Sequence, residues 1–565
     1  MASLREAHHR PVSPARTTAV ALVRPAAMWH GHGMPDQASL SRRQVLRAGA
    51  GVAGLAFGGL VVGGQSQNAG AFAAATPADW ADLGRSIRGT LIMPNDPAYA
   101  TARLGWNTIY DGIAPQAVLR PAGVGDVQQA IAFCRDTGVR PTPRSGGHSF
   151  QGFSTSTGLI IDMSAMKSVT MNSQRSRARI GAGAVLIDVY AKLFQQGKMA
   201  IPGGTCPMVG ISGLTQGGGV GPFIREYGLT LDRLVGAHIV TADGQHRYVN
   251  TSEDRDIFWA IRGGGGGNFG VVTAFDFVPV PADMPTISAN MTFAWRHAER
   301  VLEAFQTWPD ALPASAHPNL VLATSDRSAN AQPTATVGLW YRGSRARADQ
   351  AMREFIAEVG VAPTSQTVLK QTFFEAEYDE YCAGFTEGQC TPVTSPGGLL
   401  PRLGLSTYSE ISSAPWPRAA NDVIVEELER WQRDRLLQPE GVSSALQAGK
   451  VIIEPLSGAV HDTAPTATAF PYRDGWLVYQ FQSRVRPGAP AETVAAGQSW
   501  VNRFMSRLTP WRTGAEYSNY GNRELDQWAT AYYGVNLPRL RKVKAAVDPG
   551  GLFRFEQSVR PDART

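Results

Sequence analysis

The residues best suited to chemistry begin with a histidine inside a glycine-rich stretch, residues 140–154, RPTPRSGGHSFQGFS. Glycine, proline and small hydroxyl residues leave the backbone bare there, so peptide N–H groups can approach a bulky anionic ligand closely. His148 has few large apolar neighbours in this stretch, which suits an imidazole that contacts the ligand. Taken alone, the stretch also fits a turn that contains an incidental histidine.

A cysteine lies in a second glycine-rich stretch further along the chain, residues 201–232, IPGGTCPMVGISGLTQGGGVGPFIREYGLTLD. Of the four cysteines, Cys206 is the one in a loop built for ligand approach. Its position downstream of the His148 loop favours a cofactor cradle over a plain turn.

Together the two stretches resemble the covalent flavin attachment sites of the berberine bridge enzyme family, within the vanillyl-alcohol-oxidase-like FAD oxidases. In that family a histidine in an R-x-G-G-H loop bonds the flavin 8α-methyl carbon, and a cysteine in a G-x-C-x-x-V-G loop bonds C6 of the ring. The matching residues here are His148 and Cys206. The resemblance runs from about residue 115 to the C-terminus and implies a bicovalent FAD.

The resemblance also implies an α+β fold in which a two-part PCMH-type FAD-binding domain carries an inserted α/β substrate-binding domain. A chain of 565 residues is too long for one core. We expect a leader at 1–75, the FAD-binding domain at 76–284, the substrate-binding domain at 285–508 and a returning C-terminal segment at 509–565.

Further site residues follow from the same resemblance. The cofactor contacts it implies, besides the two anchors, are Arg144, Ser145, Gly146, Gly147, Ser149, Val209, Gly210, Gly213, Gly267, Asn268, Gly270, Val272, Tyr517 and Asn519. The residue three past the flavin cysteine gates oxygen in this family, and valine there accompanies oxidase behaviour. Val209 therefore predicts an oxidase that reduces dioxygen to hydrogen peroxide.

Catalysis by such an enzyme needs a base for the substrate hydroxyl. The segment Tyr517-Ser518-Asn519-Tyr520 resembles the Y-x-N-Y segment of the family, which implies Tyr520 as the base, assisted by Tyr517 or a tyrosine of the middle domain. A tyrosine has a pKa of about 10, so it acts as a base only where neighbours stabilise its phenolate. The alternative is that both tyrosines merely anchor the C-terminal segment.

The N-terminal leader resembles a twin-arginine export signal. Ser41-Arg42-Arg43 precedes an uncharged run of glycine, alanine and apolar residues at 48–64, with small residues near 73–75. A membrane anchor is the alternative, although the run is weakly apolar. Residues 1–75 hold seven arginines and no lysine against Glu6 and Asp36, so they carry most of the net charge of +6. The nearly neutral remainder gives no support for a nucleic-acid partner. Met28 or Met34 is a candidate start.

Periodicity predicts the elements that position these loops. We expect helices at 125–138, 185–196, 253–261, 348–358, 420–434 and 490–508, strands at 115–121, 159–162, 169–172, 177–181, 271–280, 286–296, 320–325 and 335–341, and a hairpin over 235–249. Five consecutive glycines, 263–267, join a helix to a strand, which favours backbone pressed against a ligand over a flexible linker. No G-x-G-x-x-G follows an early strand, so a Rossmann domain is not expected.

The remaining cysteines, histidines and aromatic residues carry weaker signals. Cys134 lies on the apolar side of the helix predicted at 126–135, and Cys382 and Cys390 are close enough in sequence to bridge. His238 and His246 flank a hairpin turn, and no metal-ligand spacing occurs. Four aromatic residues are either pocket lining or core, and core is favoured: Phe373, Phe374, Tyr378 and Tyr381.

Three functions remain open: a secreted alcohol or sugar oxidase with bicovalent FAD, a natural-product tailoring oxidase, and a flavin-loaded binding protein without turnover. The export signal favours the first, and Tyr520 with Val209 argues against the third. We expect a small-molecule substrate and dioxygen as partners, with no stable membrane anchor. Nothing in the sequence identifies the substrate or the oligomeric state.

Overall fold

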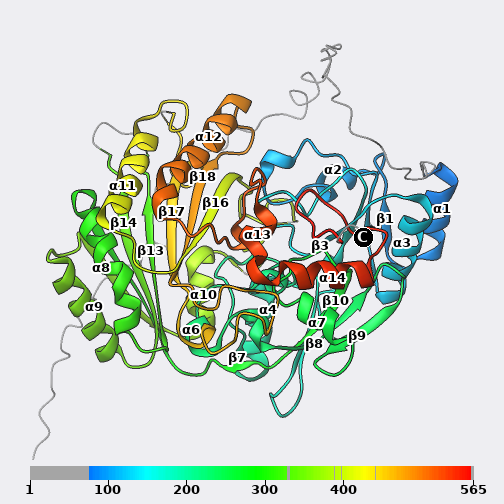
Figure 1. Ribbon diagram of the computed structural model, residues 1–565, viewed down its shortest axis with the longest axis horizontal. Helices are drawn as coiled ribbons and strands as arrows, with labels where there is room; N and C mark the ends of the chain where they lie inside the picture. The colour runs from blue at the N-terminus through cyan, green and yellow to red at the C-terminus, as the bar shows by residue number, and fades with distance from the viewer. Residues whose placement is uncertain (1–74, 327–330, 387, 396, 440, 562–565) are drawn as a thin grey trace, which may run out of the picture.

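The computed structural model describes residues 75–561 except 327–330, 387, 396 and 440 (Figure 1). The predicted export signal lies outside these residues. Within the described ranges, no helix combines the length and apolar character needed to cross a bilayer. In the same ranges, no three His, Cys, Asp or Glu side chains gather as metal ligands would.

A four-stranded sheet in the order β1-β2-β4-β3 leads into the His148 loop. Strand β1 (Thr90–Ile92) is antiparallel to β2 (Ala117–Arg120), whereas β2, β4 (Leu159–Asp162) and β3 (Pro141–Arg144) run parallel. Helix α3 (Val124–Thr137) buries Cys134 in the core and ends at Gly138, whose φ of 72° is left-handed. Helices α1 (Pro77–Ser86) and α2 (Tyr99–Ala102) precede this unit. The His148 loop therefore begins where β3 ends.

An antiparallel sheet in the order β5-β6-β10-β8-β9 forms the second half of this region, and one apolar core joins both sheets. Its strands are β5 (Val169–Met171), β6 (Ala178–Gly181), β8 (Leu234–Val240), β9 (His246–Asn250) and β10 (Val271–Phe277). The predicted hairpin is β8 with β9, and the nearest ring nitrogens of His238 and His246 are 3.2 Å apart on it. The accompanying elements are α4 (Leu186–Gly197), β7 (Met199–Ala200), α5 (Ile211–Gly217), α6 (Ile224–Tyr227), α7 (Arg255–Ala260) and β11 (Val280–Pro281).

The middle of the chain builds a seven-stranded sheet, β15-β12-β14-β13-β17-β18-β16, in which every neighbouring pair is antiparallel. The strands are β12 (Thr286–Ala294), β13 (Ala316–Ala323), β14 (Thr334–Arg342), β15 (Ser365–Gln371), β16 (Gly404–Ser412), β17 (Ala448–Pro455) and β18 (Leu477–Val485). Helices α8 (Ala298–Ala311), α9 (Arg345–Val359), α11 (Arg418–Arg433) and α12 (Ala491–Leu508) cover one face and share its core (Figure 1). The other face is left for the site, and α10 (Phe373–Cys382) lies near it.

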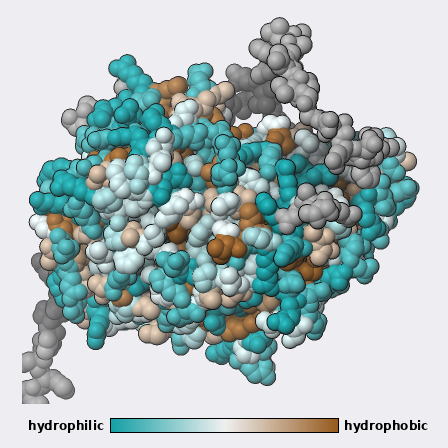
Figure 2. All heavy atoms as spheres, viewed as in Figure 1, coloured by the Kyte–Doolittle hydropathy of each residue, from teal (hydrophilic) through white to brown (hydrophobic). Residues whose placement is uncertain are grey.

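The C-terminal segment returns to the first region, through α13 (Trp528–Tyr533) and α14 (Leu537–Val547). Lys544 on α14 is buried, pairs with Asp548 at 2.7 Å and donates to the Asn268 carbonyl at 2.6 Å. This ammonium ties α14 to the residue that follows the five glycines. In the same view as Figure 1, Figure 2 shows that hydrophilic residues dominate the visible surface and that apolar residues form small separate groups.

Candidate active site

A cavity of about 370 Å³ lies between the glycine-rich loops and the free face of the seven-stranded sheet. All the residues that the sequence predicts for cofactor binding or catalysis line it: Arg144, Ser145, Gly146, Gly147, His148, Ser149, Cys206, Val209, Gly210, Gly213, Gly267, Asn268, Gly270, Val272, Tyr517, Asn519 and Tyr520. Segments more than 300 residues apart in sequence thus meet around one space.

His148 and Cys206 face each other at one side of the cavity. The Cys206 Sγ is 3.4 Å from the His148 Nε2, and the His148 ring stacks on Trp106 with centroids 4.2 Å apart. Burial lowers the pKa of His148 to about 3, so the imidazole is neutral at pH 7 and keeps a lone pair. Burial raises the pKa of Cys206 to about 11, while two backbone N–H groups and the Arg484 charge act to lower it. The two side chains can approach the same ligand from adjacent directions.

The loops around this pair are shaped by close backbone approach. A Cβ added at Gly146 would lie 2.5 Å from both the Gly210 nitrogen and the Met208 carbonyl oxygen, so the His148 and Cys206 loops pack backbone to backbone. Toward the cavity the glycines leave open space, since a Cβ at Gly213 would meet nothing within 4 Å and one at Gly267 nothing nearer than 3.8 Å. Gly267 also has φ of +77°. This bare surface fits a flat ring system and the anionic chain attached to it.

Two of the predicted cofactor residues, Arg144 and Asn268, have side chains that pair with other groups of the protein. The Arg144 guanidinium is buried and pairs with Asp162 at 3.0 Å. The Asn268 side chain donates to the Gly264 carbonyl at 2.9 Å and accepts from the Val559 N–H at 2.8 Å. These contacts hold the loops in shape.

The two C-terminal tyrosines have different partners. The Tyr517 oxygen accepts from the Gly219 N–H at 2.7 Å and from the Asn519 Nδ2 at 2.9 Å. Tyr520 packs edge to face on the Tyr517 ring, with centroids 4.8 Å apart, and its hydroxyl donates to Glu454 Oε2 at 3.2 Å. Burial, and next the Glu454 charge, raise the pKa of Tyr520 well above its ordinary value. The Tyr520 hydroxyl therefore faces the side chain of Glu454, and this contact disfavours ionisation of the phenol.

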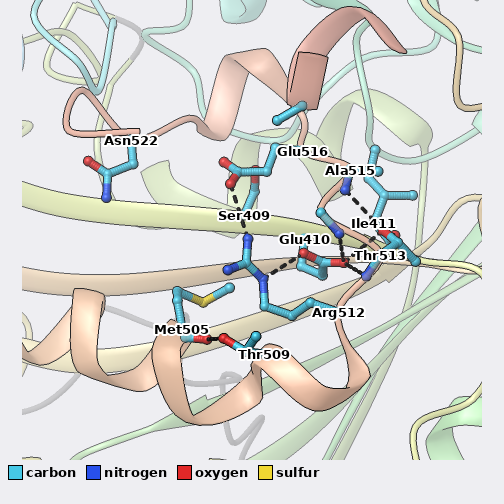
Figure 3. A network of polar contacts seen from close by, with 12 residues as sticks. Ser409, Glu410, Ile411, Met505, Thr509, Arg512, Thr513, Ala515, Glu516 and Asn522 are labelled. Carbon is cyan, nitrogen blue, oxygen red and sulfur yellow. Dashed lines mark hydrogen bonds and ion pairs between the residues drawn. The ribbon is translucent and has the colours of Figure 1, made fainter. Parts of the chain in front are cut away.

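Strand β16 fixes the segment that carries these tyrosines (Figure 3). Its Glu410 is fully buried and accepts from Arg512 Nε at 2.9 Å and from the Thr513 backbone N–H and side-chain hydroxyl. The neighbouring Ser409 hydroxyl accepts from the Tyr517 N–H at 3.1 Å. Because buried charges are stable only when paired and hydrogen-bonded, this network sets the register of the C-terminal segment on the sheet.

The free face of the sheet contributes polar residues that the sequence prediction missed. They are His317, Asn319, Lys450, Glu454, Gln480, Gln482 and Arg484, from β13, β17 and β18. His317 and Gln480 are each 4% exposed, and neither ring nitrogen of His317 nor Gln480 Nε2 has a hydrogen-bond partner. His317 Nε2 lies 3.6 Å from Glu454 Oε1. The alternation of aromatic and polar residues at 479–482, YQFQ, was the signal that could have found this face.

Helix α10 closes the cavity near Cys206. Glu380 and Tyr381 line the cavity, whereas Phe373 is buried in the core, so the four aromatic candidates divide between the two roles. Cys382 at the end of α10 forms a disulfide with Cys390, with Cα atoms 5.5 Å apart. The bridge fixes the loop that leads to the cavity-lining residues after 399.

Comparisons with known proteins agree with this geometry. Residues 115–250 match the family described as FAD binding domain, and residues 516–560 match the family described as Berberine and berberine like. The FAD-linked oxidoreductase YgaK of Bacillus subtilis is 31% identical over 497 residues, covering 85% of this chain and 98% of its own. The xylooligosaccharide oxidase of Thermothelomyces thermophilus is 28% identical over 466 residues, covering 79% of this chain and 87% of its own.

The structure of BBE-like 1 from Physcomitrella patens has a TM-score of 0.75 at 24% identity and covers 86% of this chain and 100% of its own. The α+β architecture and these matches define an FAD-linked oxidoreductase of the PCMH superfamily. The chain belongs to the berberine bridge enzyme-like family.

Proposed function

We propose that this protein is an exported oxidase that converts a hydroxyl of a sugar or oligosaccharide to a carbonyl or lactone and reduces dioxygen to hydrogen peroxide. The observation that carries the proposal is a pair of buried polar side chains on the sheet, His317 and Gln480, whose ring nitrogens and Nε2 have no hydrogen-bond partner among the described residues, beside the Tyr520–Glu454 contact. Buried donors without partners are costly, so a ligand rich in hydroxyl groups fits this surface. The xylooligosaccharide oxidase among the relatives supports the same substrate class.

His148 and Cys206 would hold FAD covalently, and the backbones of the loops at 144–149, 204–210 and 263–270 would hold the rest of it. When bound, FAD would supply the acceptor for the hydride that leaves the carbinol carbon and would pass the two electrons on to dioxygen. The open glycine surface and the neutral His148 fit this group. Val209 lines the cavity beside Cys206, as the proposed oxygen gate requires.

The chain's own residues manage the proton. Tyr520 takes the proton of the substrate hydroxyl while its own proton passes to Glu454, so no free phenolate is formed. This relay explains how a tyrosine whose pKa is raised can still act as a base, because the carboxylate is the final acceptor. Tyr517, held by Gly219 and Asn519, positions the Tyr520 ring.

A peroxide-coupled screen of purified protein against neutral sugars, oligosaccharides and polyketide-type alcohols tests the proposal. We expect sugars to give peroxide and to bleach the flavin in the absence of oxygen. A tailoring oxidase is the second candidate, because Leu400, Leu403 and Leu405 give one side of the cavity an apolar lining that suits an aglycone. Turnover of the hydrophobic alcohols alone would favour that candidate, and no turnover of either class would contradict both.

Export through the twin-arginine signal is part of the proposal. It is supported by Arg42 and Arg43 ahead of the uncharged run at 48–64. Replacing both arginines by lysine should retain the protein in the cytoplasm, and unchanged export would contradict this route.

A further inference from the structure

A second cavity, of about 340 Å³, lies beside the cavity that contains His148 and Cys206, and neither of these two residues lines it. The residues that line both cavities stand between them: Pro143, Phe153, Gly266, Gly267 and Phe555. In this wall the Phe153 and Phe555 rings pack on one another, with centroids 4.8 Å apart. The second cavity therefore has a lining of its own, apart from the two proposed flavin anchors.

Three arginines and one glutamate are the charged residues that line the second cavity. Arg140 directly precedes β3, and Arg523 follows the Tyr520 segment. Arg554 and Glu556 lie in the stretch after α14. Burial lowers the pKa of Arg140, Glu556 opposes this effect, and the charges of the other two arginines add to it. Because a guanidinium stays protonated in proteins, the cavity has a surplus of two positive charges.

The three arginines differ in how far they are paired. Arg523 forms an ion pair with Glu556 and donates to the Gln151 carbonyl at 3.2 Å. Arg554 donates to one backbone carbonyl at 3.3 Å. Among the described residues, neither Arg140 nor Arg554 has an ion pair, and the Arg140 guanidinium makes no hydrogen bond. A guanidinium has five N–H donors, so most of the donors of these two residues are available to a ligand.

Arg140 and Arg554 also line a third cavity, but its acids do not neutralise them. Each of these acids contacts another cation at 3.7 Å or less: Asp243 and Asp254 contact Arg247, and Asp548 contacts Lys544. The carboxylate that does act on Arg140 is Glu556, which is shared with Arg523. The positive surplus of the second cavity is therefore not cancelled from its far side.

The second cavity also has a neutral donor without a partner. Thr155 lines it and is 9% exposed, and its Oγ1 has no hydrogen-bond partner in the part of the chain that the structure describes. A buried hydroxyl left in this state costs free energy that a ligand oxygen would recover. Beside it Gly267 leaves open space, since a Cβ there would meet nothing nearer than 3.8 Å. A ligand oxygen can thus contact a hydroxyl as well as the guanidinium groups.

We infer that this second cavity binds a small molecule through a phosphate group. A phosphate ester has a charge of about −1.5 to −2 at pH 7 and three acceptor oxygens, which matches the positive surplus and the unused donors. Guanidinium groups bind two oxygens of a phosphate at once. The rings of Phe153 and Phe555, with Pro141, offer an apolar surface to the organic part of the molecule. This site is separate from the proposed oxidation and does not depend on it.

Calorimetric titration with inorganic phosphate tests the inference on protein with a full flavin content, and acetate is the comparison anion. We expect phosphate to bind about tenfold more tightly than acetate, and Arg140→Met and Arg554→Met each to weaken phosphate binding about tenfold. Glu556→Gln removes the competing carboxylate, so it should strengthen phosphate binding about threefold, which general damage to the fold would not do. Arg353→Met removes an exposed charge from α9 and should leave the affinity unchanged.

Three results would overturn the inference. Phosphate could fail to bind, it could bind no better than acetate, or it could bind the Arg140→Met/Arg554→Met double variant as tightly as wild type. Loss of the flavin absorbance in either single variant would also overturn it, because the cavity would then serve the cofactor. Peroxide formation is not measured in this test, so failure of the proposed oxidation leaves the phosphate site in place.

Discussion

Replacing Glu454 by glutamine should slow substrate oxidation without removing the flavin. The change keeps the shape of the side chain and an oxygen 3.2 Å from the Tyr520 hydroxyl, but an amide cannot accept the proton. Burial already raises the pKa of Tyr520 well above its ordinary value, so the phenol has no other strong acceptor among its described contacts.

General base catalysis contributes about 10²- to 10⁴-fold, which corresponds to about 3–5 kcal/mol of the activation free energy. We therefore expect Glu454→Gln to lower the rate of anaerobic flavin bleaching by that factor, with an unchanged flavin spectrum and melting temperature. Stopped-flow absorbance at the flavin band measures this step directly, apart from reoxidation.

The matched comparison is Tyr520→Phe and the double variant. If Tyr520 and Glu454 form one relay, the double variant should be no slower than the slower single variant, because residues that act as a unit are not additive. A Glu454→Gln rate within threefold of wild type, or losses that multiply in the double variant, would refute the relay.

The remaining predictions concern the supports of the site. Arg512→Met should lower the free energy of unfolding by about 3–5 kcal/mol, because it leaves the buried Glu410 without its cation. A thermal melt measures this loss, and a melting temperature unchanged from wild type would contradict the network. Replacing both Cys382 and Cys390 by serine should lower the free energy of unfolding by about 2–3 kcal/mol, because the disulfide no longer restricts a short loop in the unfolded chain. Steady-state kinetics should show KM raised more than kcat is lowered. Unchanged KM and stability would argue against a positioning role for the disulfide.

Much of the cofactor side of the site could be predicted from the sequence because glycine-rich loops carry their signal locally. His148 and Cys206 each lie in a bare stretch, and the structure brings them to 3.4 Å. The helix α3 and the β8–β9 hairpin follow from apolar periodicity and from the Asp243-Gly244 turn.

The substrate side was harder to predict because its residues come from strands that pair over long sequence separations. Glu454 meets Tyr520 across 66 residues, and nothing near either residue specifies the partner. Arg144 shows a second limit of local pattern, since it lines the cavity as predicted, but its place in the loop does not reveal that its guanidinium is buried beside Asp162. Local sequence pattern shows which residues could take part in a site, whereas the register of the paired strands decides which of them come into contact.

We propose that His148 and Cys206 hold one flavin through two bonds. Peptide mass spectrometry of acid-precipitated protein tests it most directly: we predict a yellow pellet and a single flavin adduct that joins the His148 and Cys206 peptides, with His148→Ala and Cys206→Ala each leaving one link. A folded preparation whose FAD is released by acid, with both peptides unmodified, would contradict the account.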